Sequence, residues 1–177
     1  MRIVLIAIAG LCLLSACNQK NDYEKIIHDP VLFSETVHEL NEVVMGNNFS
    51  PIVASRNYTY ASIAAYEVMA AAHPDQYESL GGQLHGLGLL PKPEAGKKID
   101  FEFASILAFI TLGEAVTFPE GSMSAYTDSL KKLAKDHGMP RTVYNNSVAY
   151  AKEVSDVILN WSKKDNYLQT RTAPKYT

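Results

Sequence analysis

One stretch decides the predicted fold: residues 50–72, SPIVASRNYTYASIAAYEVMAAA. Ser50 can cap a helix, and Pro51 suits the first helical position because its missing N–H costs nothing there. No glycine or further proline follows until Pro74, so the pattern predicts one unbroken helix. Apolar residues lie on almost every side of it, and its alanines keep much of the surface small. A helix of this kind is usually buried among other helices.

Two charged side chains interrupt this apolar helix, Arg56 and Glu67. They share a face, but a rise of about 16 Å separates them, so they cannot pair with each other. Each therefore needs a partner on another element or a route to water. For Arg56 we expect a structural ion pair inside the bundle, because the fork of its guanidinium suits carboxylates. For Glu67 we likewise expect a structural role.

Helical periodicity predicts four further helices, at about residues 29–45, 99–116, 122–137 and 142–163. The segment 76–98 is rich in glycine and proline, and we expect a long irregular loop there, with one short helix around residues 77–84. No stretch has the pattern of a strand. The predicted fold is therefore all-α: a bundle of about five helices around the buried central helix, within a helical domain at residues 29–166. Residues 167–177 are predicted to be an extended tail.

The N-terminus has the pattern of a secretory signal, with a basic start followed by an apolar run from Ile3 to Leu14. The tetrapeptide that ends at Cys17, Leu-Ser-Ala-Cys, resembles the lipobox of bacterial lipoproteins. Cleavage would then remove residues 1–16 as a signal peptide, and Cys17 would be acylated, with residues 17–28 as a polar tether. A plain membrane anchor is the alternative, but the run is short against the roughly 20 residues that a bilayer crossing needs.

These features predict a lipid-anchored protein of the bacterial cell envelope, bound to the membrane through Cys17. The residue after it, Asn18, is not the aspartate that resembles an inner-membrane retention signal, so the outer membrane is favoured. Cleavage also removes Cys12, the other of the two cysteines, and leaves no free thiol. A disulfide framework, a thiolate metal site and a cysteine nucleophile are therefore excluded for the mature chain.

Composition and net charge disfavour several classes of function. The chain has 177 residues, of which 47% are hydrophobic, and this suits one globular domain with a real core. Its net charge is −3 and the charges are mixed along the chain, which disfavours nucleic-acid binding. None of the five histidines lies three or four positions from another, so no helical metal site is predicted. We predict no metal-binding or cofactor-binding residue in this chain.

Two segments carry a family resemblance. Residues 49–56, FSPIVASR, resemble the early helix of the vanadium-dependent haloperoxidase group within the PAP2 (phosphatidic acid phosphatase type 2) superfamily, and Tyr66-Glu67 stands where that helix ends in Ala-x-Tyr-(Asp/Glu). The end of the chain is similar to the Bacteroidetes lipoprotein branch, with WSKKD at residues 161–165 and TRTAPKYT at 170–177. The resemblance covers most of the mature chain, although neither segment carries chemistry.

The resemblance implies chemistry that this chain does not contain. Enzymes of the superfamily bind phosphate or vanadate through Lys…Arg-Pro, Ser-Gly-His and Ser-Arg…His, and none of these motifs is present in the sequence. No residue is therefore carried over as catalytic, and vanadate or phosphate is expected only in a full-length relative. Arg171 and Lys175 are expected to be solvated.

Two functions remain open at this point. In the first, the chain is the N-terminal helical scaffold of a PAP2-type phosphatase or haloperoxidase, inactive alone, with residues 167–177 leading to a missing catalytic half. In the second, it is a stand-alone helical lipoprotein that acts as a binding or scaffolding module. A homodimer that covers the apolar faces is a third arrangement.

Overall fold

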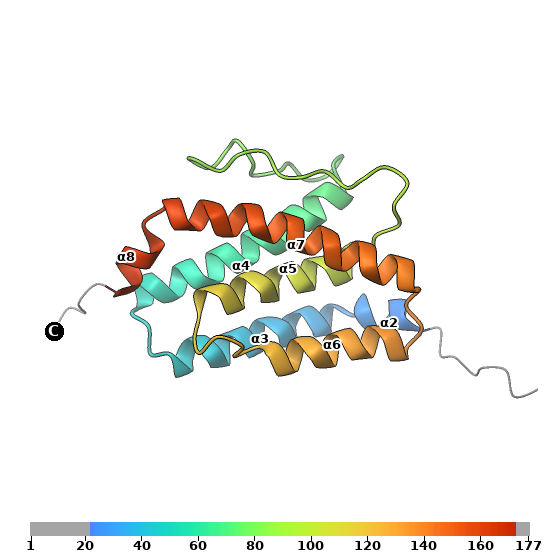
Figure 1. Cartoon of the computed structure of the whole chain (residues 1–177), viewed down its shortest axis with the longest axis horizontal. Coiled ribbons are helices and arrows are strands. Elements are labelled where there is room, and N and C mark those ends of the chain that lie inside the picture. The colour runs from blue at the N-terminus through green and yellow to red at the C-terminus, as the bar shows by residue number, and fades with distance from the viewer. Residues whose placement is uncertain (1–21, 173–177) are drawn as a thin grey trace, which may run out of the picture.

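A computed structural model describes residues 22–172 of the chain. That range contains seven helices and no strand, which confirms the all-α prediction. The helices are α2 (Tyr23–Ile27), α3 (Pro30–Gly46), α4 (Pro51–Ala72), α5 (Phe101–Val116), α6 (Ser124–Asp136), α7 (Arg141–Lys164) and α8 (Tyr167–Thr172). The five long helices lie side by side, and the two short ones lie at opposite ends of the bundle (Figure 1). None of these helices is long and apolar enough to cross a membrane.

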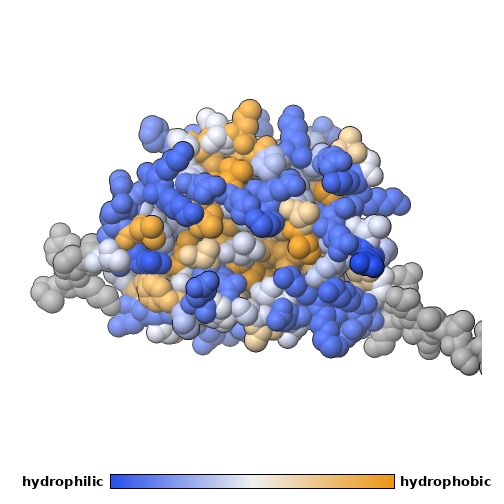
Figure 2. All heavy atoms as spheres, viewed as in Figure 1, coloured by the Kyte–Doolittle hydropathy of each residue, from blue (hydrophilic) through white to orange (hydrophobic). Residues whose placement is uncertain are grey.

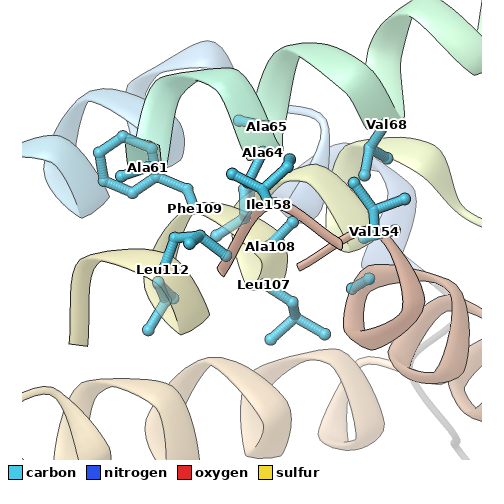
Figure 3. Packing of buried hydrophobic residues seen from close by; sticks show 14 of the residues in the cluster. Ala61, Ala64, Ala65, Val68, Leu107, Ala108, Phe109, Leu112, Val154 and Ile158 are labelled. Atoms are coloured by element: carbon cyan, nitrogen blue, oxygen red, sulfur yellow. The ribbon is translucent and has the colours of Figure 1, made fainter. Parts of the chain in front are cut away.

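The core is centred on two helices, α4 and α5, which pack on each other more extensively than any other pair. Of the 16 residues of α5, 11 are buried, and they lie on all of its faces. Helix α4 was predicted to be the buried centre, and it shares that place with α5. Helix α7 covers both, and Figure 3 shows Val154 and Ile158 of α7 reaching the side chains between α4 and α5.

Small residues explain how closely α4 and α5 approach. The alanines at positions 61, 64 and 65 of α4 face α5, where Ala108 lies opposite (Figure 3). At this contact the hydroxyl of Ser105 donates a hydrogen bond to the carbonyl of Ala65, at 3.1 Å. On the other side of α5, a Cβ on Gly113 would lie 2.8 Å from a methyl of Leu40 on α3. The α4–α5 contact therefore needs alanines, and the α3–α5 contact needs glycine at position 113, because larger side chains would not fit.

The outer helices are amphipathic. In α3 the Asp29 side chain accepts a hydrogen bond from the backbone N–H of Val31, which confirms the helix start predicted there. The buried hydroxyl of Thr36 bonds to Tyr126 of α6 at 2.8 Å, so a polar pair joins these two helices. Figure 2, which has the same view as Figure 1, shows apolar residues in the middle of the molecular surface and hydrophilic side chains around them.

The start of α4 differs from its prediction in one detail. Ser50 is the residue that precedes the helix and Pro51 occupies the first turn, as expected, but the Ser50 side chain makes no capping hydrogen bond. Phe49 packs on Phe118 with ring centroids 5.1 Å apart, and this contact fixes the chain just before the helix begins. Packing therefore defines this helix start where a side-chain cap was expected.

The segment between α4 and α5 is irregular throughout, so the short helix predicted around residues 77–84 was wrong. The loop is instead held by side chains of the bundle. The buried carboxylate of Glu67 accepts hydrogen bonds from Ser79 Oγ at 2.7 Å and from the Leu80 N–H at 2.6 Å. Tyr150 and Trp161 of α7 donate to the carbonyls of Pro91 and His85. Glu67 thus has the structural role expected of it, with donors from a loop.

Both ends of the described chain are helical where the sequence analysis predicted extended or irregular structure. Residues 23–27, placed in the polar tether, form α2, because Ile27 is buried at 1% exposure and its helix packs on α6. Residues 167–172, placed in the extended tail, form α8, because Tyr167 is buried at 2% exposure against α4 and α7. One buried anchor in each segment is enough to dock it. The signal peptide and Cys17 lie outside the described residues.

Candidate functional site

The two segments that carry the family resemblance meet at one end of the bundle. Arg56 extends from α4 toward the turn between α7 and α8, where Asp165 follows the last residue of α7. We call the group of Arg56, Tyr60, Asp165, Tyr167 and Thr170 the Arg56 cluster. Its members are up to 114 positions apart in the chain, so only the folded bundle assembles it.

Arg56 binds several groups at once. Its Nη2 lies 2.7 Å from the Asp165 carboxylate and 2.5 Å from the Asp165 carbonyl oxygen. Its Nη1 donates to Thr170 Oγ1 at 2.9 Å, and its Nε donates to the Tyr60 hydroxyl at 3.1 Å. The structural ion pair expected for Arg56 is therefore present, but its carboxylate is 46% exposed at the end of α7 and does not lie inside the bundle. Asp165 lies where α7 ends, and the carbonyl bond adds an electrostatic cap to that helix end.

Tyr60 is the buried member of the cluster, with 2% of its surface exposed. Its hydroxyl donates to Asp165 Oδ2 at 2.5 Å and accepts from Arg56 Nη2 at 2.8 Å. Burial raises the pKa of the Tyr60 phenol to about 12; the bond to Asp165 adds to this rise and Arg56 opposes it. The ring also meets Trp161 and Tyr167 edge to face, at centroid distances of 5.7 and 5.4 Å. The phenol is thus a neutral bridge between the two charges.

Tyr167 connects the Arg56 cluster to the core. Its hydroxyl lies 2.6 Å from the Val116 carbonyl of α5 and 2.5 Å from the side-chain oxygen of Asn57, which is fully buried. A phenol has one proton, so it cannot donate to two oxygens. If the Asn57 amide is turned over, its nitrogen donates to Tyr167 and the phenol donates to Val116, which also gives that nitrogen a partner. We assign the amide this way.

Arg171 of α8 lies beside the cluster and is only partly exposed, where full solvation was expected. Its guanidinium lies over the rings of Phe118 and Tyr167, at 5.0 and 5.7 Å from their centroids, and its Nε is buried. Arg56 lies 5.4 Å from the same Tyr167 ring, so this ring contacts two cations. Stacking explains why α8 docks although it is only six residues long. Lys175, the other tail cation considered, lies outside the described residues.

A hollow of about 700 Å³ opens next to Arg171, between the end of α5 and the start of α6. Its charged lining consists of Arg171, Glu114 and Glu120, and Ser124 donates a hydrogen bond to Glu114. No histidine lines it. One cation beside two carboxylates does not suit a phosphate or a vanadate, which needs several cations and donors around its oxygens. The residues around this hollow therefore do not fit the oxyanion of the PAP2 superfamily.

The Arg56 cluster works as a clamp. Its guanidinium is already bonded to a carboxylate, a carbonyl, a phenol and a hydroxyl, so its donors serve groups of the protein itself. The sequence predicted Arg56 but missed Tyr60, Asp165 and Tyr167. Arg56 and Tyr60 are four positions apart on one helix, and this spacing is a local signal from which their contact could have been predicted. No local signal links Arg56 to Asp165, which follows 109 positions later.

The histidines are spread over the described chain. His38 is exposed and lies 3.9 Å from Glu42 on α3, and His137 contacts Asp22 at 2.7 Å. His28 is different, because it lies within 4.8 Å of both Asp100 and Glu102, which are more than 70 positions away. Spacing along one helix could not reveal this group.

A solved structure is similar to this chain: the crystal structure of a bacterial vanadium-dependent iodoperoxidase. The two share 38% sequence identity and superpose with a TM-score of 0.75 over 82% of this chain. The chain spans about a third of that structure, 35% of its length. No protein-family model matches the chain, and no curated protein matches it. The bundle thus has a vanadium haloperoxidase-related helical fold.

Proposed function

We propose that this chain is the N-terminal helical scaffold of a vanadium haloperoxidase-like or PAP2-like enzyme, and that the residues which bind the oxyanion lie outside these 177 positions. One observation carries the proposal: the match to the iodoperoxidase combines 38% identity with coverage of only 35% of that protein. Because that neighbour is a peroxidase, we favour iodide or another halide as substrate over a phosphate ester.

The chemistry of the chain agrees with a scaffold. Neither Arg-Pro nor Ser-Gly-His occurs in the sequence. Arg56 is held by its own cluster, and Arg171 is stacked on two rings beside two carboxylates. A centre that stabilises charge on vanadate or phosphate needs donors aimed at the oxyanion. These two arginines are committed to holding α8.

The Arg56 cluster then has a defined purpose. It fixes α8 against α4 and α7, and so determines the position of residue 172 at the end of α8. In a longer enzyme this would set the position of the segment that follows. Precise placement of reacting groups is worth several kcal/mol in catalysis. We propose that the clamp supplies such placement to a catalytic half.

The same end of the bundle exposes four large apolar side chains, each between 41% and 68% exposed: Met45, Ile52, Phe118 and Leu168. They come from the end of α3, the start of α4, the turn after α5, and α8. Apolar side chains that gather in this way commonly mark a covered surface. We propose that the catalytic half covers them.

We further propose that the enzyme is held to the bacterial envelope, with the outer membrane favoured, by acyl chains on Cys17. Each buried methylene contributes about 0.8 kcal/mol, so several chains give a stable anchor. Growth with radiolabelled palmitate should label the wild-type protein and leave Cys17→Ser unlabelled. Equal labelling of both would exclude this lipidation.

The nucleotide sequence after the codon for Thr177 tests the scaffold proposal. An open frame that continues into Arg-Pro, Ser-Gly-His and a later Arg…His would support it. A stop codon at that position, with no such motifs encoded next to it, would favour the stand-alone helical lipoprotein that acts as a binding or scaffolding module.

A further inference from the structure

A second charged group lies at the opposite end of the bundle from the Arg56 cluster. His28 lies between α2 and α3, Asp100 precedes α5, and Glu102 is in the first turn of α5. His28 Nε2 is 2.9 Å from Asp100 Oδ2 and 3.6 Å from Glu102 Oε2. We call these three residues the His28 cluster.

Asp100 is held in place from two sides. Its carboxylate is 4% exposed, and its Oδ1 accepts the N–H of Phe103 at 2.9 Å. Its own N–H donates to Ser147 of α7, also at 2.9 Å. The second oxygen, Oδ2, is left to face His28. The Oδ1 bond is the N-cap bond of α5, and together with the Ser147 bond it fixes the carboxylate, as the supporting bonds of a metal ligand also do.

The spacing of the three donor atoms suits a shared metal ion. Two ligands about 2.1 Å from one ion lie roughly 3.0 Å apart in octahedral geometry and roughly 3.4 Å apart in tetrahedral geometry. The observed separations of 2.9 and 3.6 Å lie close to these values. Because all three atoms lie within 4.8 Å of one another, one ion can reach them with small side-chain adjustments.

Charge and access favour a cation as well. Asp100 and Glu102 lie next to the His28 imidazole, and Glu24 adds negative charge that also acts on it. His28 and Glu102 also line a mainly apolar hollow of about 560 Å³, together with Tyr66 and Tyr77. The side chains of His28 and Glu102 are 38% and 41% exposed, which leaves the outer side of a bound ion open to water or to a small ligand. Three protein ligands and one open position are typical of accessible zinc sites.

We propose that His28, Asp100 and Glu102 form a binding site for a divalent transition-metal ion of the zinc class. One nitrogen and two carboxylate oxygens are ligands that such ions accept, and two carboxylates balance the charge of the ion. A bound ion would tie the α2–α3 junction to the start of α5. This site is separate from the Arg56 cluster and does not depend on the scaffold proposal.

A simple ion pair is the competing explanation. Carboxylates at the start of α5 are favoured by the helix dipole, and His28 can bridge them as a cation. Calorimetric titration of the purified, metal-free chain with Zn²⁺ at mildly alkaline pH separates the two. The variants are His28→Asn and Glu102→Gln, and the matched control is His38→Asn, which removes an exposed histidine paired with Glu42.

We expect one Zn²⁺ per chain, with affinity lowered at least about tenfold in both cluster variants and unchanged in the control. Glu102→Gln keeps the test decisive if His28→Asn folds poorly, because Glu102 is well exposed. Three results would overturn the site: no binding by the wild type, equal binding by all the chains, or a loss confined to His38→Asn.

Discussion

The two charged clusters join distant segments by different means. The Arg56 cluster is closed around two buried phenols: Tyr60 and Tyr167 are each 2% exposed and the Arg56 side chain is 22% exposed, although Asp165, at 46%, faces water. The His28 cluster is open: only Asp100 is buried, and the imidazole faces a hollow. The two short helices that they adjoin, α8 and α2, lie at opposite ends of the bundle (Figure 1).

The contrast shows how burial sets what a charged group can do. In the closed cluster the donors and acceptors serve each other, so removal of one leaves buried groups unsatisfied. In the open cluster water can replace a lost partner, so stability depends little on it, while a ligand can still enter. We therefore assign a structural role to the first cluster and a binding role to the second.

Replacing Arg56 should have the largest effect. Arg56→Ala removes the bonds to Asp165, Tyr60 and Thr170. Because Asp165 is 46% exposed and water screens its pair, most of the loss comes from the buried Tyr60 phenol, and the free energy of unfolding is expected to fall by about 2 kcal/mol. Arg56→Lys keeps the charge but loses the fork, so it should recover only part of this. Urea unfolding measures both, with the exposed Arg141→Ala as control. A loss no larger than that of the control would contradict the closed clamp.

Tyr167→Phe tests the buried link below the clamp. The change deletes one hydroxyl and leaves the Val116 carbonyl and the Asn57 amide without it, which should cost about 1–2 kcal/mol. Tyr77→Phe, at a side chain that is 47% exposed, is the matched control and should change little. Equal unfolding midpoints for the two variants would mean that the link does not stabilise α8.

Without metal, the His28 cluster should contribute little to the free energy of unfolding. Glu102→Gln weakens a contact of 3.6 Å between two half-exposed groups, so its cost should stay below about 1 kcal/mol. Saturating Zn²⁺ should raise the melting temperature of the wild type and have little effect on this variant. The comparison would fail if Glu102→Gln destabilised the metal-free chain as strongly as Arg56→Ala does.

The smallest effect on stability is expected for an ion pair on the surface. Lys152 and Asp156 lie one turn apart on α7, with Nζ and Oδ2 2.6 Å apart, and both are exposed. Lys152→Ala should change the unfolding free energy by about 0.3–0.5 kcal/mol, and added salt should reduce this difference. An effect as large as that of Tyr167→Phe would show that burial does not separate the two classes.

Periodicity along one helix predicted most of the fold. The all-α class, the α4 helix and the packed, irregular loop before α5 follow from apolar spacing and from breakers such as Pro74. Helices α2 and α8 were missed because each is short and depends on a single buried residue, Ile27 or Tyr167. Such docking is a tertiary effect that local patterns do not contain.

The sites were harder to predict than the helices. Arg56 stood out because it is a lone cation in an apolar helix, but its partners Asp165 and Thr170 follow more than 100 positions later. His28 showed no metal spacing, because its two carboxylates come from the start of α5. Contacts between elements, which one sequence does not reveal, create both clusters.

Iodide oxidation by the purified chain, with vanadate and hydrogen peroxide supplied, tests the central claim most directly. The claim is that these 177 residues are a scaffold whose charged groups hold helices and bind no oxyanion. We expect no vanadate-dependent turnover above a protein-free blank and no hydrolysis of a simple phosphate ester. Vanadate-dependent iodide oxidation that disappears in Arg56→Ala or Arg171→Ala, while the protein stays folded, would contradict the account.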